Sequence, residues 1–153
     1  MKQLKRFDEI ISFNKKDPNV LGFIGFGSMH HTNRLDAYSD IDFFIIVNQH
    51  KESFLSSIKW LEVAPVAWWY QETRDGLKVM YEDGIFLEFA VFYLEELAHI
   101  PFEHGTIYYL KDGVDKEAFT PKKMPSKEIN ISHVFNTWLS NLYIGLLRHH
   151  RGE

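Results

Sequence analysis

The sequence predicts a mixed α+β fold in which helices pack on a small, largely antiparallel sheet. Apolar residues recur at helical spacing near both ends of the chain. Short apolar runs, typical of buried strands, lie between these segments. Two dipeptides with strong hairpin-turn propensity, Asp75-Gly76 and Asp83-Gly84, separate three consecutive strand-like runs, which favours an antiparallel meander.

The first half of the chain contains two predicted helices. Residues 2–16 place apolar side chains at helical spacing among charged ones, and the turn formers of residues 17–19 end this helix. Residues 51–63 repeat the pattern, and residues 94–100 predict a further short helix.

The expected strands are Val20–Phe26, Asp40–Asn48, Val66–Glu72, Leu77–Glu82, Ile85–Phe92 and Thr106–Leu110.

Composition bounds the class of protein. The 153 residues correspond to one domain, and the absence of cysteine excludes disulfide scaffolds, thiolate metal sites and cysteine nucleophiles. A net charge of −4 argues against a nucleic-acid partner. Because no apolar run approaches the ~18 residues of a membrane span and no signal-peptide pattern opens the chain, we expect a cytoplasmic protein without a membrane partner.

The pair Asp40 and Asp42 is the most informative feature. Residues two apart on a strand point to the same face, so the two carboxylates are expected side by side. The flanking run is apolar and holds no basic residue, and proteins tolerate such a pair mainly when a cation or a shared proton compensates the charge. Oxygen ligands of this kind favour Mg²⁺. The alternative is an edge strand whose acids point to water.

Glu88 is the sole charge in the apolar run Ile85–Phe92. If this strand lies beside Asp40–Asn48, three carboxylates converge on one patch, suited to holding a metal and accepting a proton. The alternative is a structural role for Glu88 in an ion pair with Arg or Lys.

Gly27-Ser28 follows the first predicted strand directly. A glycine and a hydroxyl at this position let backbone N–H groups approach a phosphate closely. Ser28 can also cap a helix. Arg34, six residues after Ser28, can neutralise phosphate charge, and it is equally consistent with an exposed loop arginine.

Taken together, these residues resemble a family signature. Phe26-Gly27-Ser28, followed by Tyr38-Ser39-Asp40-Ile41-Asp42-Phe43 and a third acid at Glu88, is similar to the signature of the nucleotidyltransferase superfamily with the DNA polymerase β-like fold. Within it, Ser39-Asp40-Ile41-Asp42 and the C-terminal pattern from Gly145 to Glu153 resemble antibiotic nucleotidyltransferases of the lincosamide and aminoglycoside type.

The resemblance implies a fold and a chemistry. The fold is a mixed, mainly antiparallel sheet with helices packed on one side, plus a C-terminal helix. Asp40, Asp42 and Glu88 are implied as metal ligands for Mg²⁺ and as catalytic residues, with Glu88 as general base on an acceptor hydroxyl. The residues implied to bind the nucleoside triphosphate are Gly27, Ser28, Arg34 and Ser39.

The chain divides at a linker rich in Pro and Lys, residues 120–126. Residues 1–120 are expected to form the catalytic domain, and residues 126–153 to form a helix that starts at Ser126 or Asn130. Its apolar stripe is too wide and too aromatic to face water, so it packs on the core or on a partner. We predict a homodimer or a helical partner protein.

The resulting hypothesis is a Mg²⁺-dependent nucleotidyltransferase that moves a nucleoside monophosphate, AMP from ATP, to a hydroxyl of a small molecule. A lincosamide or an aminoglycoside is the sharpest acceptor, which would connect the protein to antibiotic resistance. One alternative is a minimal nucleotidyltransferase antitoxin that acts on or binds a helical partner. Another is a nucleotide-binding module without catalysis.

Overall fold

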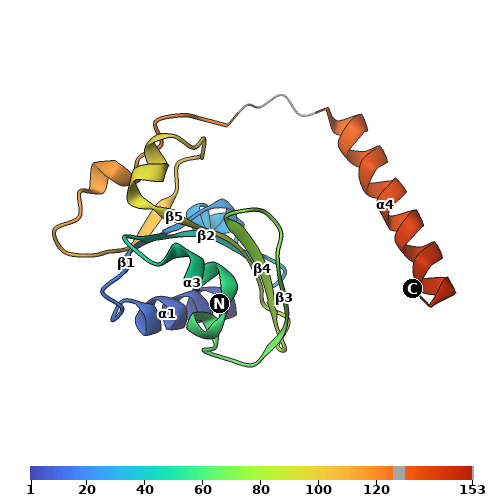
Figure 1. The fold of residues 1–153 in the computed structure, drawn as a ribbon, viewed down its shortest axis with the longest axis horizontal. Helices are drawn as coiled ribbons and strands as arrows, with labels where there is room; N and C mark the ends of the chain where they lie inside the picture. Colours follow the sequence, from blue (N-terminus) through green and yellow to red (C-terminus); the bar gives the residue numbers. More distant parts are fainter. Residues whose placement is uncertain (126–129, 153) are drawn as a thin grey trace.

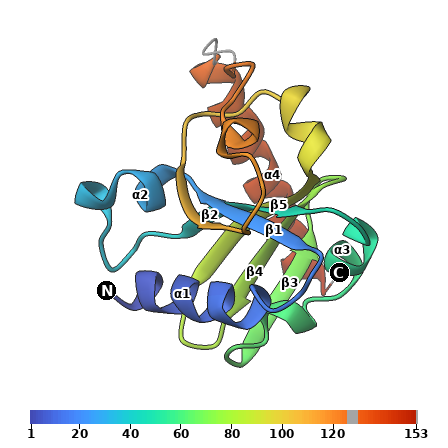
Figure 2. The same ribbon diagram turned by 90° about the vertical axis from the view of Figure 1, so that its left-hand side faces the viewer.

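A six-stranded sheet forms the centre of the computed structural model, which describes residues 1–125 and 130–152. The strand order is β3-β4-β5-β2-β1-β6, and all neighbours pair antiparallel except β2 and β5, which are parallel (Figures 1 and 2). The strands are β1 (Val20–Gly25), β2 (Ile41–Val47), β3 (Val66–Gln71), β4 (Gly76–Tyr81), β5 (Phe86–Tyr93) and β6 (Thr106–Leu110). The predicted mixed α+β class, including the β3–β4–β5 meander, is confirmed.

One face of the sheet carries the α-helices α1 (Lys2–Asn14) and α3 (Lys51–Ser56) (Figure 1). Phe7 of α1 and Phe54 of α3 belong to the larger apolar cluster, together with every second residue of β2 from Ile41. Because strand side chains alternate, the intervening residues of β2 point to the opposite face. That opposite face holds the acidic residues.

The second face is covered by short 3₁₀ segments, η3 (Leu94–Ala98) and η4 (Lys116–Phe119). Leu97, Phe102 and Phe119 pack there against Ile24 and Ile46 in a smaller apolar cluster. Between β1 and β2 the chain forms α2 (Gly27–His30) and η1 (Thr32–Arg34). The two faces therefore differ, with α-helices over one and an irregular layer over the other.

The predicted helix over residues 51–63 is interrupted. It ends at Ser56, Ser57 is extended, and a 3₁₀ turn, η2 (Lys59–Leu61), follows. The Trp60 indole N–H donates to the Phe54 carbonyl over 3.0 Å, and the ring packs edge-on against Phe89. Burial of this large ring requires the chain to turn back, which a continuous helix would prevent.

The predicted helix over residues 94–100 is the 3₁₀ segment η3, tied to α3 through Lys51. The Lys51 ammonium is nearly buried and lies 2.7 Å from carboxylate oxygens of both Asp75 and Glu96. Glu96 also accepts from the Tyr93 N–H. The start of β4, α3 and η3 thus meet at one buried cation.

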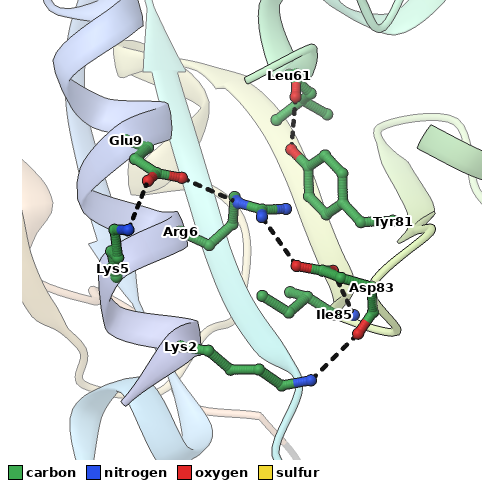
Figure 3. Close-up of polar contacts among 8 residues, drawn as sticks. All are labelled: Lys2, Lys5, Arg6, Glu9, Leu61, Tyr81, Asp83 and Ile85. Carbon is green, nitrogen blue, oxygen red and sulfur yellow. Dashed lines mark hydrogen bonds and ion pairs between the residues drawn. The ribbon is translucent and has the colours of Figure 1, made fainter. Parts of the chain in front are cut away.

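A polar contact network fastens α1 to the β4–β5 turn (Figure 3). The Arg6 guanidinium donates to Asp83 over 2.9 Å and to Glu9 over 3.1 Å, and it lies over the Tyr81 ring at 4.4 Å. The Lys2 ammonium donates to the Asp83 carbonyl. Burial raises the pKa of the Tyr81 hydroxyl, which donates to the Leu61 carbonyl.

The C-terminal helix α4 (Ile131–Arg151) is exposed along its whole described length. Asn130 caps it by accepting from the His133 N–H, and Gly152 ends it in the left-handed conformation, with φ 76°. The alternative start at Ser126 lies outside the described residues. The largest apolar side chains of α4 are exposed to solvent, and Trp138 is 57% exposed. Among the described helices, none has the length and apolar character needed to cross a membrane.

Candidate active site

Three carboxylates meet where the two parallel strands run side by side. Asp40 directly precedes β2, Asp42 lies within it, and the register places Asp42 opposite Glu88 of β5. One carboxylate oxygen from each acid lies within 4.8 Å of the others. On the helix-covered face, Phe43 and Phe89 stack with their centroids 4.9 Å apart. Strand alternation therefore turns the neighbouring acids to the opposite face.

Asp42 carries the electrostatic strain of this cluster. Burial, followed by the charges of Asp40 and Glu88, raises the pKa of the Asp42 carboxyl from its ordinary 3.8 to about 6, and Lys78 opposes the rise. Repulsion between close carboxylates has this effect, and a bound cation relieves it. The Glu88 side chain is 48% exposed, so it is open to an incoming group.

Gly27 brings the backbone against Asp42. Its φ is +50°, and a Cβ at this position would lie 2.7 Å from Asp42 Oδ2. The N–H of Phe26 donates to the Asp42 carbonyl over 2.9 Å. Only glycine satisfies both the conformation and the contact, so the segment after β1 lies directly beside the acids.

The other predicted phosphate-binding residues lie at different distances from the cluster. The Ser28 hydroxyl donates to the Asp40 carbonyl over 3.3 Å, which places it beside the acids. The Ser39 hydroxyl is engaged in the preceding turn, where it donates to Asp36 over 3.0 Å. Arg34 is exposed in η1 and does not line the cleft described below.

Gln3 anchors the loop that precedes Asp40, a role that the sequence did not predict. It is 1% exposed, and its amide donates to the Asp36 carbonyl over 2.9 Å and to the Ser39 carbonyl over 3.2 Å. α1 thereby holds the loop that ends at Asp40. The signal was available, because Gln3 stands four residues before Phe7, in line with the buried stripe of the helix.

Lys78 is the second residue that the sequence reading missed. It stands directly opposite Glu88 in the antiparallel register of β4 and β5. Its ammonium lies 3.4 Å from Glu88 Oε2 and 2.8 Å from Glu72 Oε1. Lys78 lies between the buried residues Leu77 and Val79 of β4. Strand alternation therefore points its side chain to the other face of the sheet, which holds the acids.

A cleft of about 440 Å³ opens next to Asp42 and Glu88. Aromatic side chains form one wall, with the Phe26 and Phe44 centroids 4.5 Å apart and Phe102 beyond them. The remaining lining includes Glu72, Thr73, Gly76, Ala90, Pro101 and Glu103. The lining of the cleft therefore combines acidic and aromatic side chains, and its size is typical of small-molecule sites.

The donor set matches Mg²⁺. All three candidate ligands are carboxylates, and among the residues that the structure describes no histidine joins the cluster. Mg²⁺ typically takes one or two protein carboxylates and completes its shell with water and substrate phosphates. The absence of a Cβ at Gly27 lets the backbone after β1 lie against the Asp42 carboxylate, so its N–H groups are close to any cation that the acids hold.

Comparisons with known proteins found no matching family model and no matching curated protein. Several solved structures are similar, of which three are described. An aminoglycoside 6-adenyltransferase from Bacillus subtilis shares 16% identity at TM-score 0.47, over 61% of this chain and 36% of that one. A CD-NTase from Bradyrhizobium diazoefficiens in complex with GTP shares 20% identity at TM-score 0.45, over 69% of this chain and 35% of that one.

The third is a spectinomycin adenyltransferase from Enterococcus faecialis with ATP and spectinomycin, at 20% identity and TM-score 0.36, over 70% of this chain and 40% of that one. The chain thus spans 35% to 40% of the length of these three proteins.

Proposed function

We propose that the protein is a metal-dependent nucleotidyltransferase that moves a nucleoside monophosphate, AMP from ATP, to a hydroxyl of a small molecule. The observation that supports this most is the position of Asp40, Asp42 and Glu88, within 4.8 Å of one another beside a cleft. Gly27 and Ser28 lie against the same acids.

In this proposal Asp40 and Asp42 hold Mg²⁺, with Glu88 as a third carboxylate. The ion supplies positive charge to the phosphate oxygens of the bound nucleotide. The backbone of Gly27 and the Ser28 hydroxyl bind the β- and γ-phosphates, and Arg34 and Ser39 are further candidates for this role. These contacts orient the triphosphate so that the acceptor hydroxyl is in line with the bond that breaks.

Glu88 accepts the proton of the acceptor hydroxyl as its oxygen bonds to the α-phosphorus. The bond from that phosphorus to the bridging oxygen breaks at the same time, and pyrophosphate leaves. The half-exposed position of Glu88 at the cleft gives an acceptor access to this carboxylate.

The cleft supports a compact, hydroxyl-bearing acceptor. Its aromatic wall can cover the face of a sugar or cyclitol ring, and the carboxylates of Glu72 and Glu103 suit amino groups. A lincosamide or an aminoglycoside has this chemistry, so the proposal extends to antibiotic modification.

Pyrophosphate release tests the reaction. The protein is incubated with ATP or GTP, Mg²⁺ and a panel of lincosamides and aminoglycosides, with the Glu88→Gln variant as control. We expect release with at least one pair, and loss of release in the variant. Calorimetric binding of nucleotide without release on any acceptor would refute transferase activity and indicate a binding module.

We further propose that residues 1–120 form the catalytic unit and that α4 associates with a second copy of the chain. Phe135, Leu139, Leu142 and Leu146 alternate by four and three residues, which is the spacing of a two-stranded helical seam. These side chains are between 43% and 58% exposed. Water contact over so much apolar surface favours pairing.

Sedimentation of the wild type and of Leu142→Glu tests this association. We expect a dimer for the wild type and a monomer for the variant. A monomeric wild type would refute self-association. Recovery of a stoichiometric complex with a small helical protein encoded beside this one would instead favour the alternative function, an antitoxin that modifies or binds its partner through α4.

A further inference from the structure

Lys78 is the one basic side chain that the described structure pairs with the three-acid cluster. Its ammonium is shared between two carboxylates, 2.8 Å from Glu72 and 3.4 Å from Glu88. Only Glu88 belongs to the candidate metal ligands. The other partner lies at the rim of the cleft, where Tyr70 also donates to it.

The backbone holds Lys78 in this position. The β4–β5 register places its Cα directly opposite that of Glu88, and β3 flanks it on the other side through Tyr70. The side chain is 22% exposed, so its charge is only partly screened by water. Both carboxylates are thus within reach of the same ammonium in one arrangement of the sheet.

We infer that Lys78 is the protein's own counter-cation for this site: it occupies Glu88 in the metal-free protein and yields that carboxylate to an incoming divalent cation, remaining on Glu72. This inference rests on the metal site of the proposed function. Three carboxylates within 4.8 Å repel one another, and a fixed ammonium compensates them. The same ammonium repels a divalent cation, so it sets the affinity of the site.

Replacement of Lys78 and replacement of Glu72 should change the Mn²⁺ affinity in opposite directions. Loss of the ammonium, in Lys78→Met, removes the competitor, and we expect Mn²⁺ to bind about ten-fold more tightly. Loss of the outer partner, in Glu72→Gln, leaves the ammonium to Glu88 alone, and we expect Mn²⁺ to bind several-fold more weakly. A purely structural role for the Lys78–Glu72 pair would not move the two affinities in opposite directions.

The experiment titrates the full chain with Mn²⁺ in the absence of nucleotide, followed by the electron paramagnetic resonance signal of the free ion. Lys78→Arg keeps the charge and should bind Mn²⁺ as the wild type does. Lys59→Met removes an exposed charge elsewhere and is the matched control. In the Lys78→Met background, Glu72→Gln should change the affinity by less than about two-fold, because the coupling runs through the ammonium.

Unchanged or weaker Mn²⁺ binding by Lys78→Met, with a wild type that binds Mn²⁺, would overturn the inference and leave the metal site intact. An equal effect of Glu72→Gln in both backgrounds would overturn it as well. Absence of Mn²⁺ binding by the wild type and by Lys78→Met alike would overturn the metal site itself, and the inference with it.

Discussion

Replacement of Asp42 by Asn should stabilise the metal-free protein at neutral pH. Burial and the neighbouring acids raise the pKa of the Asp42 carboxyl from its ordinary 3.8 to about 6. The folded protein therefore binds this proton more tightly than the unfolded chain does. The stabilisation that the proton provides is complete below pH 3.8 and is lost as the pH rises through 6.

The size of the effect follows from that difference in pKa. About two pKa units correspond to ~3 kcal/mol, and partial exposure of the carboxyl group reduces the expected penalty to about 1–3 kcal/mol. Asn removes the charge and keeps the shape. Asp42→Asn should therefore be more stable than the wild type by about 1–3 kcal/mol at pH 7.5 and nearly equal to it near pH 4.

Urea unfolding in EDTA at both pH values measures this difference. Asp112→Asn, an exposed acid in a turn, is the matched control and should show no pH-dependent difference from the wild type. Saturating Mn²⁺ should stabilise the wild type but not Asp42→Asn, because only the wild type holds the ion. A variant less stable than the wild type at pH 7.5, or one whose stability difference is the same at both pH values, would refute the reasoning.

Three further variants test the supports of the site. Gly27→Ala should bind Mn²⁺ more weakly and lose about 1–2 kcal/mol of stability, because residue 27 has a φ of +50° and the new Cβ would meet Asp42. A variant that binds Mn²⁺ in calorimetry as tightly as the wild type does would contradict this. Gln3→Leu removes the side-chain amide that donates to two loop carbonyls and should cost about 1–3 kcal/mol in urea unfolding; an unchanged midpoint would count against the anchoring role. Lys51→Met removes the buried cation that pairs with two carboxylates and should cost roughly 2–4 kcal/mol, whereas Lys59→Met should cost almost nothing. Equal stability of the two variants would disprove the role of Lys51.

The three acids that cluster in the candidate site could be picked out from the sequence because their signal is local. Asp40 and Asp42 stand two apart at the start of an apolar strand, and Glu88 is the sole charge in another. Burial of an unpaired charge is costly, so an acid in an apolar run is a candidate either for a site or for an ion pair. The turns of the β3–β4–β5 meander were equally visible, because each depends on a short stretch of chain.

The support of the site was not predictable, because it depends on contacts between distant residues. The turn at Asp83-Gly84 predicts that β4 and β5 pair, but no local pattern indicates the register that places Lys78 opposite Glu88, ten residues later. Gln3 reaches carbonyls more than thirty residues away. The break after Ser56 follows from burial of Trp60 against Phe89, which local helix propensity does not describe.

By itself, the sequence determined the class of fold, the order of the strands along the chain and the three candidate carboxylates, since strand alternation and hydrophobic periodicity are properties of neighbouring residues. Only the tertiary structure decided that β2 and β5 run parallel with Asp42 opposite Glu88, and that Lys78 shares its charge between two acids. The physical reason is distance along the chain. Hairpin turns specify only the pairing of strands that follow one another, whereas the pairing of distant strands is chosen by the packing of the whole sheet.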